Sequence, residues 1–457
     1  MPVEKKMSFS TLPVAATVPP GPAFVASLRE IQKNPLKFLV ENTNKYGDVF
    51  GYQVDNWSVV VLNHPDHIKR VLQDKNSNFT KQGTPDLMML RPMLGEGLMT
   101  SEGDSWLWQR HLIQPGFHRE RIEFFGRLMT DATLKMLKQW ETRADSSQSL
   151  DLAAELSRLT LNIVAVALFS ADISNEGDDF SHAVDVMNEY MANFDPTDLG
   201  RLAQFNASQA SLNRVVNGII GERRSRQENS GDLLSMLMTA YDEKTGEGMS
   251  DRQLRDQIFT LLMAGHETTA KSLTWTLYLL DQHPDIAVRL RAELDAVLNG
   301  RVANYEDLPN MPYTWMVIQE AMRIYPPVWL VSRLCQADDV IGGYLIPSGS
   351  LVIVSPYIMH RHKEFWSDPE TYDPERFSPE AGSARPPFAY LPFSGGPRQC
   401  IGRAFATVET QLVLATIMQR FELRLEAGRP VEPEALVTLR PRYGLPMFVE
   451  RRAADEW

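Results

Sequence analysis

One cysteine, Cys400, stands in a sequence that suits a metal-binding thiolate. It lies in the segment Phe393–Gly402, read Phe-Ser-Gly-Gly-Pro-Arg-Gln-Cys-Ile-Gly, immediately before a predicted helix. The glycines and the proline allow the backbone to fold tightly around the sulfur. The helix that follows directs free N–H groups and partial positive charge toward the sulfur, which favours a thiolate. Such a thiolate is a suitable axial ligand for haem iron, whereas the common alternative for a lone cysteine is an inert buried side chain. The second cysteine, Cys335, lacks this context and is predicted to be structural.

An acid and a hydroxyl are adjacent in Ala264–Thr269, read Ala-Gly-His-Glu-Thr-Thr, in the middle of a long predicted helix. A glycine within a helix costs about 1 kcal/mol relative to alanine, so Ala264 and Gly265 indicate that something flat and bulky lies against the helix. Glu267 and Thr268 could relay protons to bound, reduced dioxygen. The alternative is a polar helix turn in which the threonine bonds to the preceding turn. A zinc-protease motif is excluded because its second histidine is absent.

Three charged residues are candidates for a buried cluster. Glu320 and Arg323 lie three residues apart on one predicted helix face and can pair. Alone they would form an ordinary surface ion pair worth well under ~1 kcal/mol. Arg376, in the segment Tyr372–Phe377, could complete a three-way cluster that fixes the irregular stretch beneath a cofactor.

A tryptophan and three arginines could hold the two propionates of a haem through charge-assisted hydrogen bonds. Trp106 and Arg110 are four residues apart on a predicted helix, and Arg333 and Arg398 lie much further along the chain. The alternative is that each arginine is solvated or paired locally. His111 and His360 are weaker candidates for the same role.

The elements that must position these residues are mostly helical. Ser250 with Gln253 has the pattern of a capping box, and a helix of about 33 residues, ~50 Å long at 1.5 Å per residue, runs from there to Pro284. The other predicted elements are a hairpin at Val49–Leu62, helices at 284–300, 313–325 and 402–421, and two short strands within Val340–Ser355. The stretch 362–397 is dense in proline, glycine and serine, and long irregular stretches of this kind are usually functional.

Composition narrows the class of protein. The chain has 457 residues, 43 % hydrophobic and 23 % charged, which are globular values. A net charge of −12 argues against nucleic-acid binding, and two cysteines exclude a disulfide scaffold. No apolar stretch reaches the ~20 residues of a membrane span and no signal peptide is recognisable, so we expect no transmembrane anchor and a cytoplasmic location. Residues 1–22 read as an extended lead-in and 23–457 as a single domain.

These features, in this order, resemble the cytochrome P-450 superfamily of haem-thiolate monooxygenases, of the soluble bacterial type. The resemblance implies a mainly α fold with a small β region: a triangular helical prism with heme b (iron protoporphyrin IX) between the long central helix and the helix after the Cys400 loop. It implies that Cys400 is the proximal ligand. The implied haem contacts are Trp106, Arg110, Ala264, Arg333, Phe393, Arg398 and Gly402. It also makes Glu267 and Thr268 the acid–alcohol pair for cleavage of the O–O bond, and Glu320, Arg323 and Arg376 the structural cluster.

The resemblance implies that O₂ and a lipophilic substrate are used and that electrons come from a separate partner. We expect a ferredoxin or flavodoxin with its NAD(P)H reductase. The partner would dock on the Cys400 side, where a basic patch is predicted from Arg119, Arg121, Arg398 and Arg403, with scattered solvated arginines as the alternative.

The predicted substrate pocket is apolar and rich in methionine, which suits a sizeable lipophilic molecule. Its predicted lining residues are Met88, Leu90, Leu94, Leu262, Met263, Val328, Leu330 and Val437. The residues 47–62 contain no lysine or arginine that could hold a carboxylate, which weakens a fatty-acid hydroxylase and leaves terpenoids, steroids, polyketides and other lipids. Two other hypotheses are an isomerase or dehydratase that needs no external electrons, and a non-enzymatic haem-binding sensor or carrier.

Overall fold

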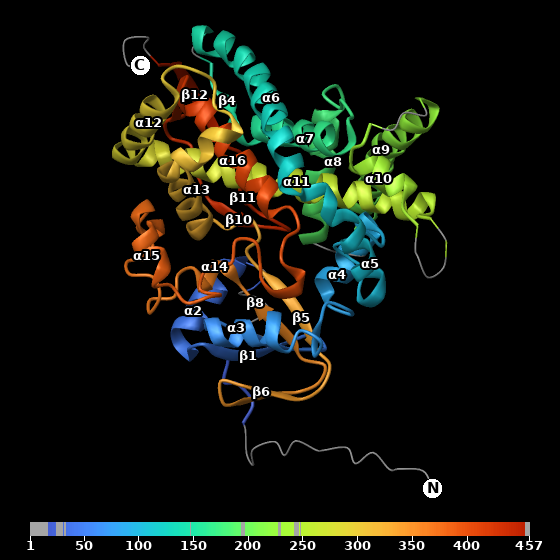
Figure 1. Cartoon of the computed structure of the whole chain (residues 1–457). Coiled ribbons are helices and arrows are strands. Elements are labelled where there is room, and N and C mark those ends of the chain that lie inside the picture. Colours follow the sequence, from blue (N-terminus) through green and yellow to red (C-terminus); the bar gives the residue numbers. More distant parts are fainter. Residues whose placement is uncertain are drawn as a thin grey trace.

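The computed structural model describes residues 17–23, 31, 33–146, 148–192, 197–226, 230–241, 246 and 248–452. A large helical part lies beside a smaller part built around a sheet (Figure 1). Most of the predicted lead-in, residues 1–16, lies outside the described residues. Its last residues are irregular, and the backbone N–H of Gly51 donates to the carbonyl of Pro20 at 2.8 Å, so they lie along the first strand.

The helices are of very unequal length. They are α2 (Pro35–Tyr46), α3 (Pro65–Lys69), α4 (Pro85–Leu94), α5 (Gly103–Ile113), α6 (Arg119–Ser146), α7 (Leu152–Phe169), α8 (Gly177–Ala192), α9 (Leu199–Arg226), α10 (Leu233–Thr239), α11 (Asp251–Gln282), α12 (Pro284–Leu298), α13 (Pro312–Ile324), α14 (Pro356–Met359), α15 (Pro379–Ser383) and α16 (Arg403–Met418). Single helical turns occur at η1 (Arg70–Asp74), η2 (Gln114–Phe117), η3 (Tyr305–Asn310), η4 (Pro374–Phe377) and η5 (Gly396–Arg398).

The strands form one five-stranded sheet and three smaller ones. They are β1 (Val49–Val54), β2 (Trp57–Leu62), β3 (Phe79–Thr80), β4 (Leu150–Asp151), β5 (Val331–Cys335), β6 (Asp339–Ile341), β7 (Tyr344–Ile346), β8 (Leu351–Val354), β9 (Phe421–Leu425), β10 (Pro433–Ala435), β11 (Leu439–Pro441) and β12 (Pro446–Arg451). The large sheet has the order β1-β2-β8-β5-β3, with β2 and β8 parallel and its other pairs antiparallel. The other sheets are β4-β12-β9, β6-β7 and β10-β11.

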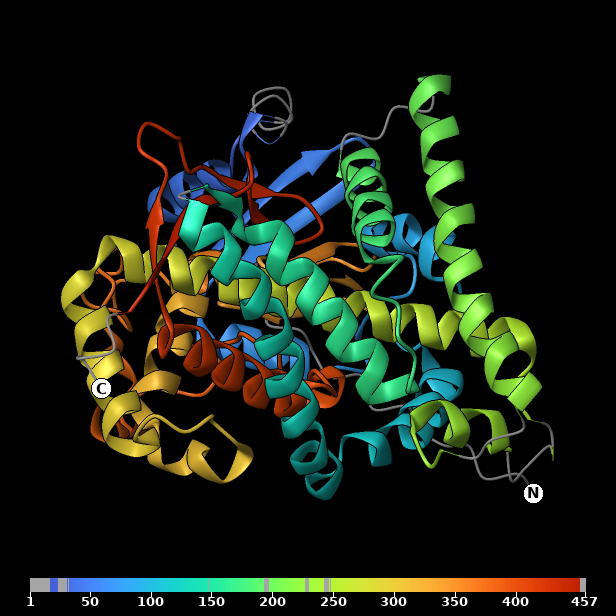
Figure 2. The ribbon, with the colours of Figure 1, turned by 90° about the horizontal axis from the view of Figure 1, so that it is seen from above.

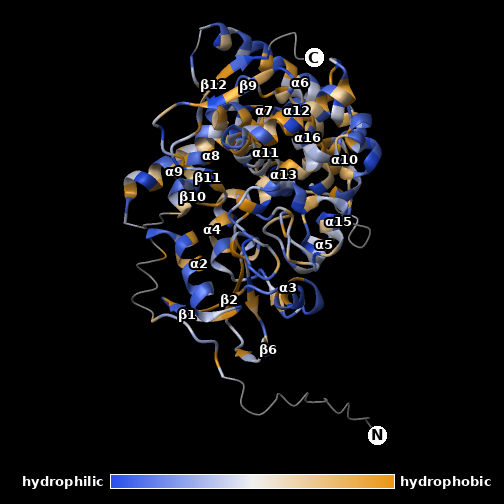
Figure 3. Ribbon diagram, turned by 90° about the vertical axis from the view of Figure 1, so that its left-hand side faces the viewer, coloured by the Kyte–Doolittle hydropathy of each residue, from blue (hydrophilic) through white to orange (hydrophobic). Residues whose placement is uncertain are grey.

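The helix α11 crosses the middle of the helical part, with α7, α13 and α16 packed against it (Figure 2). Hydrophobic residues are concentrated where these helices meet (Figure 3). The helix α7 has the length and apolar character of a membrane span, with a mean hydropathy of 1.6, but 72 % of its residues are buried inside the fold. It therefore has the burial of a core helix.

Most sequence-predicted elements are confirmed, with small differences in their ends. The hairpin is β1-β2, and the capping box of Ser250 and Gln253 begins α11. The helices predicted at 284–300, 313–325 and 402–421 are α12, α13 and α16. The segment Val340–Ser355 was predicted to hold two strands and contains parts of three, because Gly342 and Gly343 turn the chain into a β6-β7 hairpin at positive φ values of 58° and 84°.

The mid-helix Gly265 has a reason in helix packing that the sequence did not reveal. A Cβ atom added there would lie 2.9 Å from Cγ2 of Val164 on α7, so the glycine allows α11 and α7 to approach closely. The contact that excludes a side chain at this position is therefore with another helix.

We predict that Gly265→Ala lowers the free energy of unfolding in the wild-type background. The added methyl group overpacks the α7 contact, which typically costs about 1–3 kcal/mol and exceeds the ~1 kcal/mol gained in helix propensity. In a Val164→Ala background the same substitution should instead stabilise, because the clash is gone. Denaturant unfolding of the four proteins measures both effects, and an equal effect in the two backgrounds would contradict the packing explanation.

Candidate active site

The loop that carries Cys400 is held by backbone contacts with η1 and α5. Gly396 has a φ of 68°, and a Cβ there would lie only 1.9 Å from the carbonyl oxygen of Leu72, so the loop can approach η1 only through a glycine. The N–H of Cys400 donates to the carbonyl of Phe393 at 3.0 Å. Nη1 of Arg110 donates to the carbonyl of Gln399 at 3.1 Å. The position of the sulfur is thus fixed from both sides of the loop.

Cys400 is exposed as a residue, while protein encloses its thiol. Burial raises the pKa of the Cys400 thiol above its usual value, while the Gly402 backbone N–H and the charges of Arg110 and Arg403 act in the opposite direction. We expected the helix start to favour the thiolate; in the protein alone, desolvation outweighs it. A metal ion reverses this balance, since a coordinating thiol is deprotonated outright.

A group of buried cations lies beside the loop. The guanidinium of Arg398 stacks on Trp106 at 4.0 Å, donates to the carbonyl of Ser101 at 2.8 Å and pairs with Glu102 at 2.6 Å. Arg333, on β5, is 6 % exposed, and within the described part of the chain its guanidinium donates a hydrogen bond only to the carbonyl of Ser332. Burial, followed by the charge of Arg398, lowers the pKa of Arg333 to about 10.

Lys81 joins this group, and the sequence analysis missed it. Its Nζ donates to the carbonyl of Met99 at 2.7 Å. Burial, followed by the nearby charge of Arg333, lowers the pKa of Lys81 to about 8. No local motif marks this lysine; it follows the short strand β3, and only the pairing of β3 with β5 places it near Arg333.

Ala264 and Thr268 lie one turn apart in the middle of α11. They and Gly265 keep some accessible surface in a stretch that is otherwise buried from Leu254 to Leu277 except at Arg255. The hydroxyl of Thr268 donates to the carbonyl of Ala264 at 2.7 Å, which is the local bond expected of a mid-helix threonine.

The carboxylate of Glu267 faces other parts of the fold. Its Oε1 accepts a hydrogen bond from Nδ2 of Asn188 at 3.0 Å and from the hydroxyl of Thr438 at 2.5 Å. Asn188 lies on α8, and Thr438 immediately precedes β11. Glu267 is 5 % exposed, so these two donors are the main compensation for its burial. Neither donor was singled out from the sequence.

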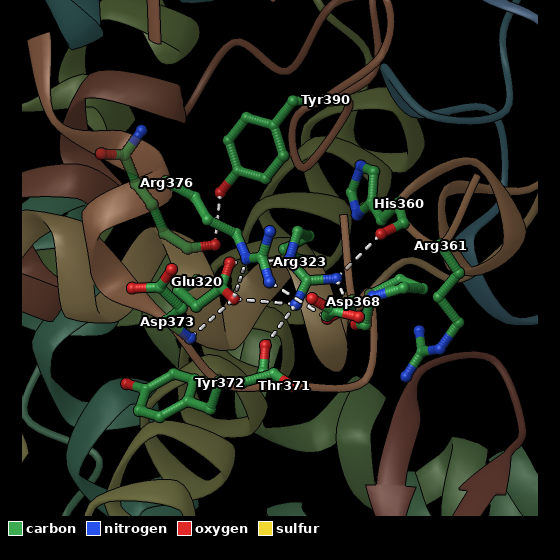
Figure 4. Close-up of polar contacts among 12 residues, drawn as sticks. Glu320, Arg323, His360, Arg361, Asp368, Thr371, Tyr372, Asp373, Arg376 and Tyr390 are labelled. Carbon is green, nitrogen blue, oxygen red and sulfur yellow. Dashed lines mark hydrogen bonds and ion pairs between the residues drawn. The ribbon is translucent and has the colours of Figure 1, made fainter. Parts of the chain in front are cut away.

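The structure brings Glu320, Arg323 and Arg376 together in one cluster (Figure 4). Nε and Nη2 of Arg323 donate to the two oxygens of Glu320 at 2.6 and 2.8 Å, and Arg376 pairs with Glu320 at 3.3 Å. Both Glu320 and Arg323 are 0 % exposed. Burial raises the pKa of Glu320, and its bond to Arg323 opposes that rise.

Arg323 also fixes the irregular stretch. It donates to the backbone carbonyls of His360, Pro369 and Thr371 at 2.9, 2.7 and 3.1 Å (Figure 4). His360, a weak propionate candidate, instead accepts the backbone N–H of Leu391 at 2.8 Å. One guanidinium therefore organises a segment of chain that has almost no regular secondary structure.

The predicted pocket residues do not share one environment. Leu262 and Leu94 are 0 % and 1 % exposed and belong to the main core, as does Met263. Met88 is 57 % exposed, because it lies one position, about 100°, beyond the buried Leu87 on α4. Its role as a pocket wall stays a prediction. The remaining predicted residues are partly buried, namely Leu90, Val328, Leu330 and Val437.

One of the four arginines of the predicted basic patch is mostly buried. Arg398 is 16 % exposed at its side chain and is paired with Glu102, so it is not part of a docking surface. Arg119 and Arg403 are exposed and Arg121 is half-buried.

Comparison with known proteins identifies the class. The profile of the cytochrome P-450 family matches residues 18–447. A cyclooctat-9-en-7-ol 5-monooxygenase of Streptomyces melanosporofaciens is 33% identical over 421 residues, 90% of this chain and 90% of that protein. An ultra-long-chain fatty acid omega-hydroxylase of Homo sapiens is 32% identical over 427 residues, 86% of this chain and 79% of that protein. The crystal structure of a cytochrome P-450 heme domain matches with a TM-score of 0.88 at 27% identity, over 96% of this chain and 99% of that chain.

Fold and comparisons together define a haem-dependent monooxygenase. The chain belongs to the cytochrome P-450 family.

The residues present fit a haem. The thiol of Cys400, an exposed residue whose sulfur is enclosed by protein and hydrogen-bonded to the Gly402 N–H, has the donor and the surroundings of an axial thiolate. Beside it the buried or half-buried cations outnumber the neighbouring carboxylates, which suits two propionates; these cations are Lys81, Arg110, Arg333 and Arg398, and the carboxylates are Asp86 and Glu102.

We predict that Arg323→Lys lowers the free energy of unfolding by about 3–5 kcal/mol, because an ammonium cannot reach both Glu320 and three carbonyls and leaves a buried carboxylate poorly compensated. Denaturant unfolding of the holoprotein measures the loss. The matched control is Glu370→Gln, which removes the neighbouring pair of Arg361 with the exposed Glu370, where the change should stay under ~1 kcal/mol. Similar losses in the two variants would contradict the role given to the cluster.

Proposed function

We propose that this protein inserts one oxygen atom of O₂ into a hydrophobic small molecule, with Cys400 as the ligand of a heme b. The overall reaction uses O₂, two electrons and two protons, and yields an alcohol and water. The observation that carries the proposal is the setting of Cys400: an exposed residue whose thiol is enclosed by protein, with the Gly402 backbone N–H hydrogen-bonded to the sulfur and the positive charges of Arg110 and Arg403 nearby. When bound, the haem supplies the binding and activation of O₂.

The chain's own residues have three tasks in this reaction. Cys400 supplies the thiolate, and the Gly402 N–H stabilises its charge. Arg333, Arg398, Arg110 and Lys81 would hold the propionates, with Trp106 as the surface on which Arg398 stacks. For the first of these tasks, the carbonyl of Phe393 also accepts the N–H of Cys400 and so orients the loop.

The third task is the supply of protons. Thr268 offers a hydroxyl on the accessible face of α11, and in donating to a bound oxygen group it would give up its bond to the Ala264 carbonyl. Glu267 would restore that proton. Both donors to Glu267 address Oε1, and in the part of the chain that the structure describes no donor reaches Oε2, which leaves that oxygen available to a water molecule.

For the substrate we propose a terpenoid, with steroids, polyketides and other lipids as less favoured classes. The support is two bacterial relatives, the cyclooctat-9-en-7-ol 5-monooxygenase at 33% identity and a pentalenene oxygenase of Streptomyces avermitilis at 32% identity. A fatty acid is the alternative, and its support is the human fatty acid hydroxylase that is 32% identical. Residues 47–62 carry no cation for a carboxylate, which favours a neutral molecule. The electron donor is proposed to be a separate ferredoxin or flavodoxin with its reductase, and a cytoplasmic location stays a prediction.

We predict that Cys400→Ser abolishes the red-shifted absorption of the reduced carbon-monoxide complex, because an alcohol is a far weaker electron donor to iron than a thiolate. Absorption spectra of the purified variants measure this directly. Cys335→Ser is the matched control: Cys335 is 1 % exposed and its thiol donates to the carbonyl of Ala337, so its spectrum should equal that of the wild type. A red-shifted band in Cys400→Ser would overturn the ligand assignment.

We predict that a twenty-carbon terpene alcohol displaces the haem water and shifts the Soret band at lower concentration than palmitate does. The expected order follows from the absence of a cation on the β1-β2 hairpin, since a buried carboxylate without a partner is costly. Titration of both compounds against the holoprotein measures the order. Tighter binding of palmitate would favour the fatty-acid alternative.

A further inference from the structure

The carboxylate of Glu267 is held by two elements that lie outside its own helix. Asn188 is 1 % exposed on α8, and Thr438 is 4 % exposed at the start of β11. Both donate to the same oxygen of Glu267, at 3.0 and 2.5 Å. The orientation of this acid therefore depends on how α8 and the β10-β11 hairpin are placed against α11.

A second contact joins the same two elements further out. Arg440 on β11 pairs with Asp185 at 3.0 Å and with Glu189 at 2.8 Å, both on α8, and with Glu434 on β10 at 3.0 Å. Its side chain is 14 % exposed. We call Arg440 with Asp185 and Glu189 the clasp, because it connects α8 to the hairpin.

The spacing of these residues makes the two contacts one layered interface. Asp185, Asn188 and Glu189 lie three and four residues apart and so share a face of α8. Thr438 and Arg440 are two residues apart in extended chain and so point the same way. The clasp is the outer layer, and the hydrogen bonds to Glu267 are the inner layer.

The hairpin side of this interface is firmly attached to the body of the protein. Nε1 of Trp275 on α11 donates to the carbonyl of Leu439 at 3.0 Å, and the N–H of Leu439 donates to the carbonyl of Pro327 at 2.9 Å. Thr438 is thus held in place by its neighbour. The α8 side meets the hairpin through ion pairs and hydrogen bonds between side chains. These interactions weaken when the charged groups move apart and water and salt screen them.

We propose that Asn188 and Thr438 are positioning residues for the Glu267 carboxylate. We further propose that their hydrogen bonds to Glu267 depend on the position of α8, which the ion pairs of the clasp hold against the hairpin. The proposal rests on the function proposed for Glu267 and adds a condition to it: the acid is correctly oriented only while α8 is docked on the hairpin. A molecule that disturbs α8 thereby disturbs proton supply as well.

The experiment compares six variants of the haem-loaded protein. Glu267→Gln removes the acid. Thr438→Val and Asn188→Leu each remove one donor with little change of volume, and Thr438→Ser keeps the donor. Arg440→Met breaks the clasp. Arg442→Met is its matched control, because Arg442 pairs with Glu432 and Glu434 and, among the described residues, makes no ion pair or hydrogen bond with α8.

The first readout is the infrared carboxylate band of Glu267, identified by its disappearance in Glu267→Gln. We expect the band to shift in Asn188→Leu, Thr438→Val and Arg440→Met, and to stay unchanged in Thr438→Ser and Arg442→Met. A band unchanged in Asn188→Leu and Thr438→Val would overturn the positioning role. A band unchanged in Arg440→Met alone would overturn the coupling to α8.

The second readout is hydrogen peroxide formed per NADPH consumed, with a surrogate ferredoxin and its reductase. Glu267→Gln should raise it, and the variants whose band shifts should raise it on the order of fivefold, which corresponds to the net contribution of one ordinary hydrogen bond. If Glu267→Gln leaves peroxide formation unchanged, the role proposed for Glu267 is wrong. If Glu267→Gln raises it and the other variants do not, only the present inference is wrong.

Discussion

The buried guanidinium of Arg323 determines the path of the backbone around it. A charge removed from water must be neutralised, and its N–H groups must find acceptors, or the fold loses several kcal/mol. Glu320 neutralises it, and three carbonyls from the segment 360–371 accept its remaining hydrogens. That segment is the first part of the irregular stretch that ends at the loop of Cys400, so a charge pair on a neighbouring helix fixes the beginning of this stretch. A stretch with few hydrogen-bonded elements of its own is thus held by one side chain.

Two glycines show how close packing sets the geometry on either side of the site. Gly396 lets the Cys400 loop touch the backbone of η1, and Gly265 lets α11 touch α7. The small residues of α11 indicate, from the sequence, that something flat and bulky lies against the helix. For Ala264 this stays a prediction, whereas the contact with Val164 explains Gly265. Two adjacent small residues can therefore have different structural reasons.

The sequence predicted what is local or carried by a compact motif. A capping box marks the start of α11, Pro284 its end and the start of α12, and Pro326 the end of α13. Lys81, Asn188 and Thr438 were missed because each acts through a partner far along the chain and carries no motif. The exposure of Met88 has a related reason: composition indicates that a helix is apolar, but the packing of α4 decides which of its faces is buried.

Glu267 and Thr268 are neighbours in sequence, yet they face different parts of the molecule. Successive residues of a helix point about 100° apart. Thr268 lies on the accessible face of α11, whereas Glu267 is bonded to α8 and to the residue before β11. In the proposed proton supply, a proton passing between them would have to travel through water or follow a rotation of the acid. In either case the contacts that orient Glu267 would control the step, and those contacts belong to the tertiary structure.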